Sequence, residues 1–316
     1  MPWKQILVGV DDSPQAAAAA ALGVRLAEAT GGECILVHAV REFWLAFAEE
    51  EIVERSAELR AALVDSARHQ IAAALRGEVP EDAIRRMIVR AGSTAAVLRD
   101  VALELGADAV ILGGKHHAAL RRWAGGRTAH NTVRSVGLPV LVTGPRAGGG
   151  GVLFRRILAA VDLSEAAAPT AAVACDLAAQ LRAELRALSV IEPPLPLPDV
   201  TPALTPSEYS GLAERTLVKR VWPLFRSPSV QTIARQGRVM EAIQLETAHW
   251  GADLLVVGSH GKGWGERLIL GSVTEQLLHD LPTSLLVVPV YAPQQPARRP
   301  PARKTVRARA QAKAKA

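Results

Sequence analysis

Residues 250–278 read WGADLLVVGSHGKGWGERLILGSVTEQLL, and this stretch decides the fold. An apolar run of the strand type ends at Gly258, a glycine-rich loop follows, and a helical pattern begins at Ser272. Residues 105–113 read LGADAVILG and repeat the pattern of residues 250–258. A strand–loop–helix unit therefore occurs twice, which predicts a chain made of two similar halves.

The repeat extends to the other apolar runs. Residues 5–11 (QILVGVD) match residues 156–162 (RILAAVD), and each half closes with an apolar run, at 138–143 and at 284–290. In the first half, strands are predicted near 5–10, 34–39, 86–90, 109–113 and 138–143. These runs are continuously apolar, as in strands covered on both faces, and alanine-rich helical segments separate them. The alternation predicts an α/β fold with two tandem, open, mostly parallel five-stranded sheets and helices on both faces.

Composition suggests where the two halves and their connections lie. We expect a first domain at 1–146, a glycine-rich linker at 147–152, a second domain at 153–291 and a disordered basic tail at 292–316. The proline-rich stretch 192–206 is expected to be a surface loop, because proline disfavours regular helix and central strand. In the first half, Ser13 is predicted to cap the first helix, with Pro14 at its first position.

Charge, apolar runs and cysteine content indicate which class of protein the chain belongs to. The 316 residues are 49% hydrophobic and carry a net charge of +6, but the residues from Tyr291 onward contribute eight positive charges, which leaves about −2 (+6 − 8) for the rest. No apolar run approaches the ~18 residues of a membrane span, and the N-terminus lacks an export signal. Cys34 and Cys175 are expected to be buried thiols, and the protein is expected to be cytoplasmic.

The glycine-rich loop has the features of a phosphate-binding segment. Gly258, Gly261 and Gly271 follow the pattern G-x2-G-x9-G, and the first of them lets a ligand or the turning backbone approach the end of the strand. Ser272 and Glu275 have the spacing of a capping box at a helix start. A helix N-terminus presents unpaired N–H groups and a partial positive charge, which favours phosphate.

Other phosphate motifs fit this loop poorly. Lys262 and Arg267 add positive charge, but Val256 stands where a P-loop requires its first glycine, and Gly263 stands where it requires Ser or Thr. The pattern G-x-G-x-x-G is also absent from the loop, which argues against a dinucleotide site. The residues predict a phosphate-bearing ligand across the end of the strand.

The repeat and the G-x2-G-x9-G-S pattern resemble the nucleotide-binding branch of the universal stress protein family, in a tandem form that covers nearly all of residues 3–290. The resemblance implies an adenine nucleotide alpha hydrolase-like fold and an adenine nucleotide ligand: ATP, with AMP or ADP as alternatives, and Mg²⁺. It implies that Asp162 contacts the adenosine, that the backbone near Val190 borders the base, and that the glycines and Ser272 hold ribose and phosphates. The full set implied is Asp162, Val190, Gly258, His260, Gly261, Lys262, Gly271, Ser272 and Val273.

The first half departs from this pattern. Asp11, Gly113 and Gly126 match their counterparts, but His116 replaces the second glycine and Arg127 replaces the serine. Histidine adopts positive φ poorly, and arginine cannot accept a capping hydrogen bond. We therefore predict one competent nucleotide site, in the second half, and a degenerate site in the first, although Arg127 could bind a phosphate through its charge.

The resemblance also bears on partners and activity. Family members associate through their last strands, which implies an intramolecular pseudo-dimer through residues 138–143 and 284–290 and leaves a homodimer open. The function predicted is an ATP-binding regulator or sensor in the stress response. The alternatives are an interaction module that binds no nucleotide, and weak non-specific binding of an acidic partner by the basic tail. No catalytic set is evident, so slow ATP hydrolysis is the most that is expected, and no metal motif includes His116, His117 or His130.

Overall fold

The computed structural model describes residues 3–41, 53–114, 127–144, 153–193, 205–227, 229–260 and 270–290. The first half comprises β1 (Gln5–Gly9), α1 (Pro14–Thr30), β2 (Glu33–Val40), α2 (Val53–Leu75), α3 (Glu81–Arg85), β3 (Ile88–Ala91), α4 (Thr94–Leu105), β4 (Ala109–Gly113), α5 (Arg127–Val136) and β5 (Val140–Thr143). The second half comprises β6 (Arg156–Ala160), α6 (Ala167–Leu181), β7 (Glu184–Ile191), α7 (Pro206–Arg220), the 3₁₀ turn η3 (Trp222–Leu224), β8 (Gln231–Gln236), α8 (Val239–Trp250), β9 (Leu254–Gly258), α9 (Ser272–His279) and β10 (Ser284–Val288).

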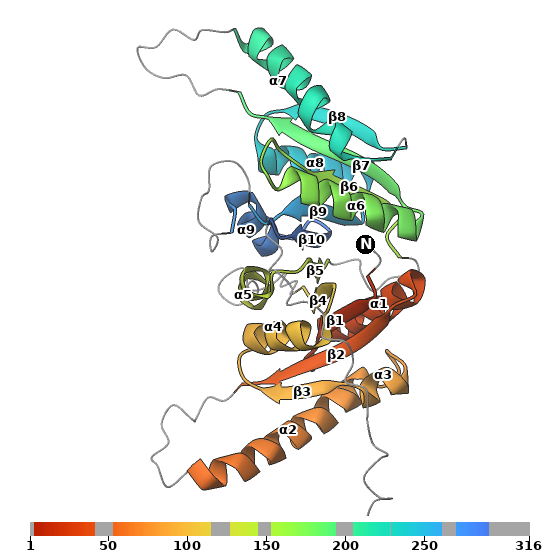
Figure 1. Ribbon diagram of the computed structural model, residues 1–316, viewed down its shortest axis with the longest axis vertical. Helices are drawn as coiled ribbons and strands as arrows, with labels where there is room; N and C mark the ends of the chain where they lie inside the picture. The colour runs from red at the N-terminus through yellow and green to blue at the C-terminus, as the bar shows by residue number, and fades with distance from the viewer. Residues whose placement is uncertain are drawn as a thin grey trace, which may run out of the picture.

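The ten strands form one continuous sheet in the order β3-β2-β1-β4-β5-β10-β9-β6-β7-β8 (Figure 1). All neighbours within a half are parallel, and the two halves join through the antiparallel pair β5–β10, in which Leu286 lies opposite Leu141. The predicted pairing of the final strands is confirmed. The predicted fold class is confirmed as well, and this pairing joins the two five-stranded sets into one sheet.

The core explains why the strands read as continuous apolar runs. All described residues of β10 are buried, and four of the five in β4 and in β9 are buried. One hydrophobic cluster covers one face of the sheet with side chains from α1 and α6, and a second covers the other face with side chains from α4, α5, α8 and α9. Both clusters span the two halves, so the junction is continuous with the core.

Shared hydrogen bonds show that the repeat is structural as well as sequential. The carboxylate of Asp108 accepts the backbone N–H groups of Lys4 and Gln5, at 2.7 and 2.8 Å. Asp253, its counterpart, accepts those of Arg155 and Arg156 at 2.8 and 3.0 Å. The Gly-Ala-Asp sequence in each half therefore ties the strand it precedes to the start of that half's first strand.

The observed start of α1 agrees with the prediction from the sequence, whereas that of α7 does not. Ser13 caps α1 as predicted, since its hydroxyl accepts the backbone N–H of Ala16 at 3.2 Å. The predicted loop 192–206 is wrong at its end, because Thr205 caps α7 and α7 begins at Pro206; residues 194–204 lie outside the described part. A capping box is present here, where Thr205 and Glu208 cap each other's backbone groups.

Two further expectations concern the cysteines and the membrane. Cys34 is buried, and burial raises the pKa of its thiol to about 12 against a smaller lowering by Arg86. Cys175 is only partly buried, which corrects the expectation of a core position.

Among the described helices, none has the length and apolar character that crossing a membrane requires. The predicted linker at 147–152 and the tail at 292–316 lie outside the described residues.

Candidate functional site

A cavity of about 260 Å³ lies at the carboxyl ends of β6, β7 and β9, between the starts of α6 and α9. This volume is near the lower end of small-molecule sites, which begin near ~300 Å³. The cavity lies at the point where the strand order reverses, the usual ligand position in open α/β sheets. All described members of the predicted set line it: Asp162, Val190, Gly258, His260, Gly271, Ser272 and Val273. Gly261 and Lys262 lie outside the described residues.

Asp162 follows β6 and organises the turn that leads into α6. Its Oδ1 accepts the backbone N–H of Ser164 at 3.0 Å and the Ser164 hydroxyl at 2.5 Å. Asp11 makes the same two hydrogen bonds with Ser13 in the first half. Both aspartates therefore shape a loop, as short side chains that fold back on their own backbone do. Asp162 in addition lines the cavity.

Helix α6 begins two residues later than the repeat would place it. Pro14, which starts α1, corresponds to Glu165, whereas α6 begins at Ala167. Pro169 gives a physical reason: in a helix that began at Glu165 it would be the fifth residue, where it has no N–H to donate to the Glu165 carbonyl. In α6 it is the third residue, before the first helical bond, which runs from Thr170 N to Ala166 O at 3.1 Å. The later start shapes the wall of the cavity that α6 provides.

The glycine at the end of β9 serves close helix packing. A Cβ on Gly258 would lie 2.5 Å from the Cβ of Ala166, which no real contact tolerates. In the first half, a Cβ on Gly113 would lie 2.8 Å from the backbone of Gln15. Both glycines thus let the helix that follows the neighbouring strand, α6 after β6 and α1 after β1, rest on the strand end. At Gly258 the nearest atom is the Ala166 Cβ, and the carbonyl oxygen of His260 in the turning backbone lies farther away, at 3.3 Å.

Two residues that the sequence reasoning missed hold the ends of the glycine loop. The carbonyl of Ser259 accepts the N–H of Gly271 at 2.9 Å, and the N–H of Ser259 donates to Val288 of β10 at 2.8 Å. The Thr274 hydroxyl donates to the Gly258 carbonyl at 2.8 Å, which fastens α9 to the strand end. The loop therefore leaves and re-enters the fold at fixed points.

The capping box predicted for α9 is wrong. Gly271, with φ −63° and ψ 144°, occupies the cap position, and no side chain caps this helix start. Ser272 is the first helical residue, too late for its hydroxyl to cap, while the N–H of Glu275 donates to the Gly271 carbonyl at 2.9 Å. The backbone N–H groups of residues 272–274 precede the first helical bond and have no partner within the helix. Residues 271–274 all line the cavity, so a helix N-terminus forms one end of it.

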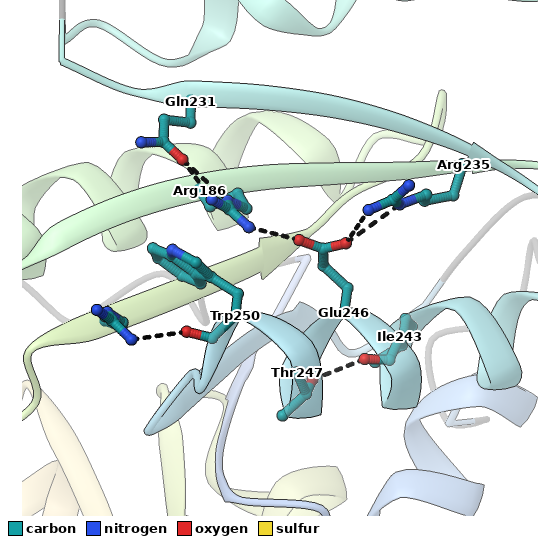
Figure 2. A network of polar contacts seen from close by, with 8 residues as sticks. Arg186, Gln231, Arg235, Ile243, Glu246, Thr247 and Trp250 are labelled. Carbon is teal, nitrogen blue, oxygen red and sulfur yellow. Dashed lines mark hydrogen bonds and ion pairs between the residues drawn. The ribbon is translucent and has the colours of Figure 1, made fainter.

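The wall formed by α8 is held by an ionic cluster around a buried carboxylate (Figure 2). Glu246, whose side chain is 1% exposed, accepts hydrogen bonds from Arg186 of β7 at 2.6 Å and from Arg235 of β8 at 2.7 Å. Arg186 also lies over the Trp250 ring, 4.3 Å from its centroid. Burial alone would raise the pKa of Glu246, but the hydrogen bonds and charges of Arg235 and Arg186 outweigh it, and the pKa is lowered.

This cluster has a direct structural consequence for the cavity. Glu246 lies on the same helix as Val239 and Ile243, which line the cavity, and Arg186 lies on the same strand as Leu188, which also lines it. The cluster thus fixes α8 against β7 and β8 and supports the apolar wall.

The first-half counterparts occupy equivalent places in the fold without the same supports. Asp11 follows β1, Gly113 ends β4, and Arg127 opens α5 as an exposed residue; Gly126 and His116 lie outside the described part. The side-chain anchor differs as well, because Ala129 stands in the position of Thr274 and has no hydroxyl. Gly114 stands in the position of Ser259, whose bonds to Gly271 and Val288 are made by its backbone.

Comparisons with known proteins agree with the geometry. The sequence matches the profile of the universal stress protein family over residues 2–144 and 153–289. A universal stress protein of Mycolicibacterium smegmatis is 28% identical over 291 residues, covering 90% of this chain and 96% of that protein.

Among solved structures, a universal stress protein from Archaeoglobus fulgidus is similar with a TM-score of 0.58 and 16% identity, covering 90% of this chain and 98% of that one. A protein of unknown function from Pseudomonas aeruginosa PAO1 is similar with a TM-score of 0.55 and 17% identity, over 90% and 92% of the two chains. At these identities the structures support the fold alone.

Proposed function

Since the chain belongs to the universal stress protein family, with one family unit in each half, we propose that it binds an adenine nucleotide in the second-half cavity and acts as a regulator or sensor in the stress response. The observation that carries this proposal is the convergence of residues far apart in sequence. Asp162, Val190 and Gly258 come from three different strand ends and line one cavity with the start of α9.

The cavity has separate regions suited to the parts of a nucleotide. Apolar side chains from β7 and α8, among them Val190, Val239 and Ile243, offer a surface for a purine ring. The N-terminus of α9 offers backbone N–H groups and a partial positive charge for phosphate. Asp162, at the start of α6, can accept hydrogen bonds from ribose hydroxyls.

The first half supports the fold in this proposal and binds no nucleotide. Arg127 stands in place of Ser272, and Ala129 stands in place of Thr274, whose hydroxyl fastens α9 to the strand end. Without this hydroxyl, the first-half counterpart of the phosphate segment lacks its side-chain tie to the strand end.

Isothermal titration of the intact chain with ATP and Mg²⁺ tests the proposal. We expect one site per chain, abolished in the double variant Gly271→Arg/Ser272→Ala, which places a large side chain at the helix start. The matched control is Arg127→Ala at the counterpart position, which should leave one site with unchanged affinity. Two sites would show that the first half also binds nucleotide. Absence of binding to the intact chain would refute the proposal and favour an interaction module that acts through its surfaces.

A further inference from the structure

Thr170 is a buried polar residue on the cavity wall. Its side chain lines the cavity, the residue is 1% exposed, and among the described residues its Oγ1 has no hydrogen-bond partner. A buried hydroxyl without a hydrogen bond destabilises the folded state, so most buried polar groups in proteins are paired.

Other helical threonines show the partner that such a hydroxyl can use. The hydroxyls of Thr216 and Thr247 donate to the carbonyls four residues earlier, Leu212 at 2.8 Å and Ile243 at 2.7 Å. Thr170 makes no such bond to Ala166 O, although its backbone N–H donates to that carbonyl at 3.1 Å. The hydroxyl therefore does not use the usual intrahelical partner.

The hydroxyl lies beside the strand end that borders the cavity. Its Oγ1 is 3.3 Å from the point that a Cβ on Gly258 would occupy. Thr170 follows Asp162 by eight residues, whereas the residue eight positions after Asp11 is Ala19. The polar group is thus present only in the half that we propose to bind nucleotide.

We propose that Thr170 is a contact residue of the bound nucleotide and that its hydroxyl forms a hydrogen bond with the nucleoside part; this inference rests on the proposed function. Thr170 belongs to α6, the helix that follows Asp162, whereas the N–H groups suited to phosphate belong to α9. A hydroxyl both donates and accepts, so it suits a ribose oxygen or a ring nitrogen of the base. Binding then satisfies a group that is unsatisfied in the free protein.

The test compares affinity with stability in the full chain. Thr170→Val keeps the shape and removes the hydroxyl, Thr170→Ser keeps the hydroxyl, and Thr132→Val removes another buried, unpartnered hydroxyl, on α5, that is not among the residues lining the cavity. Titration with ATP and with adenosine measures affinity, and thermal unfolding without ligand measures stability.

We expect Thr170→Val to lower the affinity for ATP and for adenosine by roughly threefold to tenfold, as loss of a neutral hydrogen bond does. Its Tm without ligand should stay equal or rise, because an unsatisfied group is removed; a merely structural role would lower Tm and leave affinity unchanged. Thr170→Ser should restore affinity, and Thr132→Val should not change it.

Each other outcome counts against the inference. Wild-type affinity in Thr170→Val would refute it while leaving the proposed function intact. A loss for ATP alone, with adenosine unaffected, would refute the assignment to the nucleoside part. Absence of ATP binding to the wild-type chain would refute the proposed function itself.

Discussion

Substituting alanine for Gly258 should affect stability and nucleotide binding together. The new Cβ would lie 2.5 Å from that of Ala166, and ordinary contact begins near 3.4 Å, so the end of β9 and the start of α6 must separate by about 0.9 Å (3.4 − 2.5). Inserting a methyl group into a packed core typically costs ~1–3 kcal/mol. At about 2–4 °C per kcal/mol, Tm should fall by several degrees. Both displaced elements line the cavity, so ATP affinity should fall as well.

The repeat supplies a matched control for this prediction. Gly113→Ala places a Cβ 2.8 Å from the backbone of Gln15, a similar clash in the first half. Its Tm should fall by a comparable amount, while ATP affinity stays at the wild-type value. Differential scanning fluorimetry and isothermal titration on both variants measure the two quantities. Equal affinities in Gly258→Ala and Gly113→Ala would refute the assignment of the site to the second half, and unchanged Tm values would refute the packing argument.

Three further predictions concern other parts of the fold. Glu246→Gln should lower the free energy of unfolding by about 3 kcal/mol at pH 7, because it leaves the partly buried guanidinium of Arg186 without its counter-charge. The pKa of Glu246 is lowered in the folded state, so its contribution to the free energy of unfolding is complete above the pKa of the unfolded state and is lost as pH falls through the folded pKa. Urea unfolding should therefore show a smaller difference in free energy of unfolding between wild type and variant at pH 4 than at pH 7. Cys34 should resist alkylation at pH 8 until the protein unfolds, while half-buried Cys175 reacts earlier, as mass spectrometry of labelled peptides would show. Thr205→Ala should fray the first turn of α7, which would appear as faster amide exchange there, and unchanged exchange would argue against the cap.

The fold could be predicted from the sequence because its signals are local and repeated. The apolar run 109–113 coincides with β4, and the predicted strand 34–39 lies within β2. Whether the two sets of strands form one sheet or two is set by contacts between residues far apart in sequence, such as Gly144 with Ser284, 140 positions apart. Only the family resemblance, which implies that the final strands pair, predicted that the two sets of strands join.

The residues predicted for the candidate site lie at strand ends and at the start of α9. The family resemblance implied Asp162, Val190 and Gly258, and their meeting has a physical reason, because the carboxyl ends of neighbouring parallel strands lie at one edge of the sheet. Val239, Ile243 and Thr170 were missed because they come from helices, and the orientation of a helix against the sheet depends on packing that spacing alone does not reveal.

The capping boxes show a second limit of local patterns. Thr205 and Ser272 each begin an S/T-x-x-E sequence, yet only the first acts as a cap. At α9 the N–H of Gly271 is already bonded to the Ser259 carbonyl, which fixes the direction of the chain and places the helix start one residue earlier. A distant hydrogen bond thus overrides a local signature, and it does so at the end of the glycine loop.

The junction gives a reason for the first half to persist whether or not it binds a ligand. Without β5, β10 would present a buried strand of four apolar residues and Ser284 as an open edge, which is prone to aggregation. The contact is close: a Cβ on Gly144 would lie 2.4 Å from the backbone of Thr283 and Ser284, and the Gly144 N–H donates to the Ser284 hydroxyl at 3.1 Å. The packing at the junction involves β5 and Gly144 and not the loop after β4. The residues of the loop after β4 can therefore be substituted without disturbing the junction, whereas substitutions in β5 or at Gly144 would disturb it.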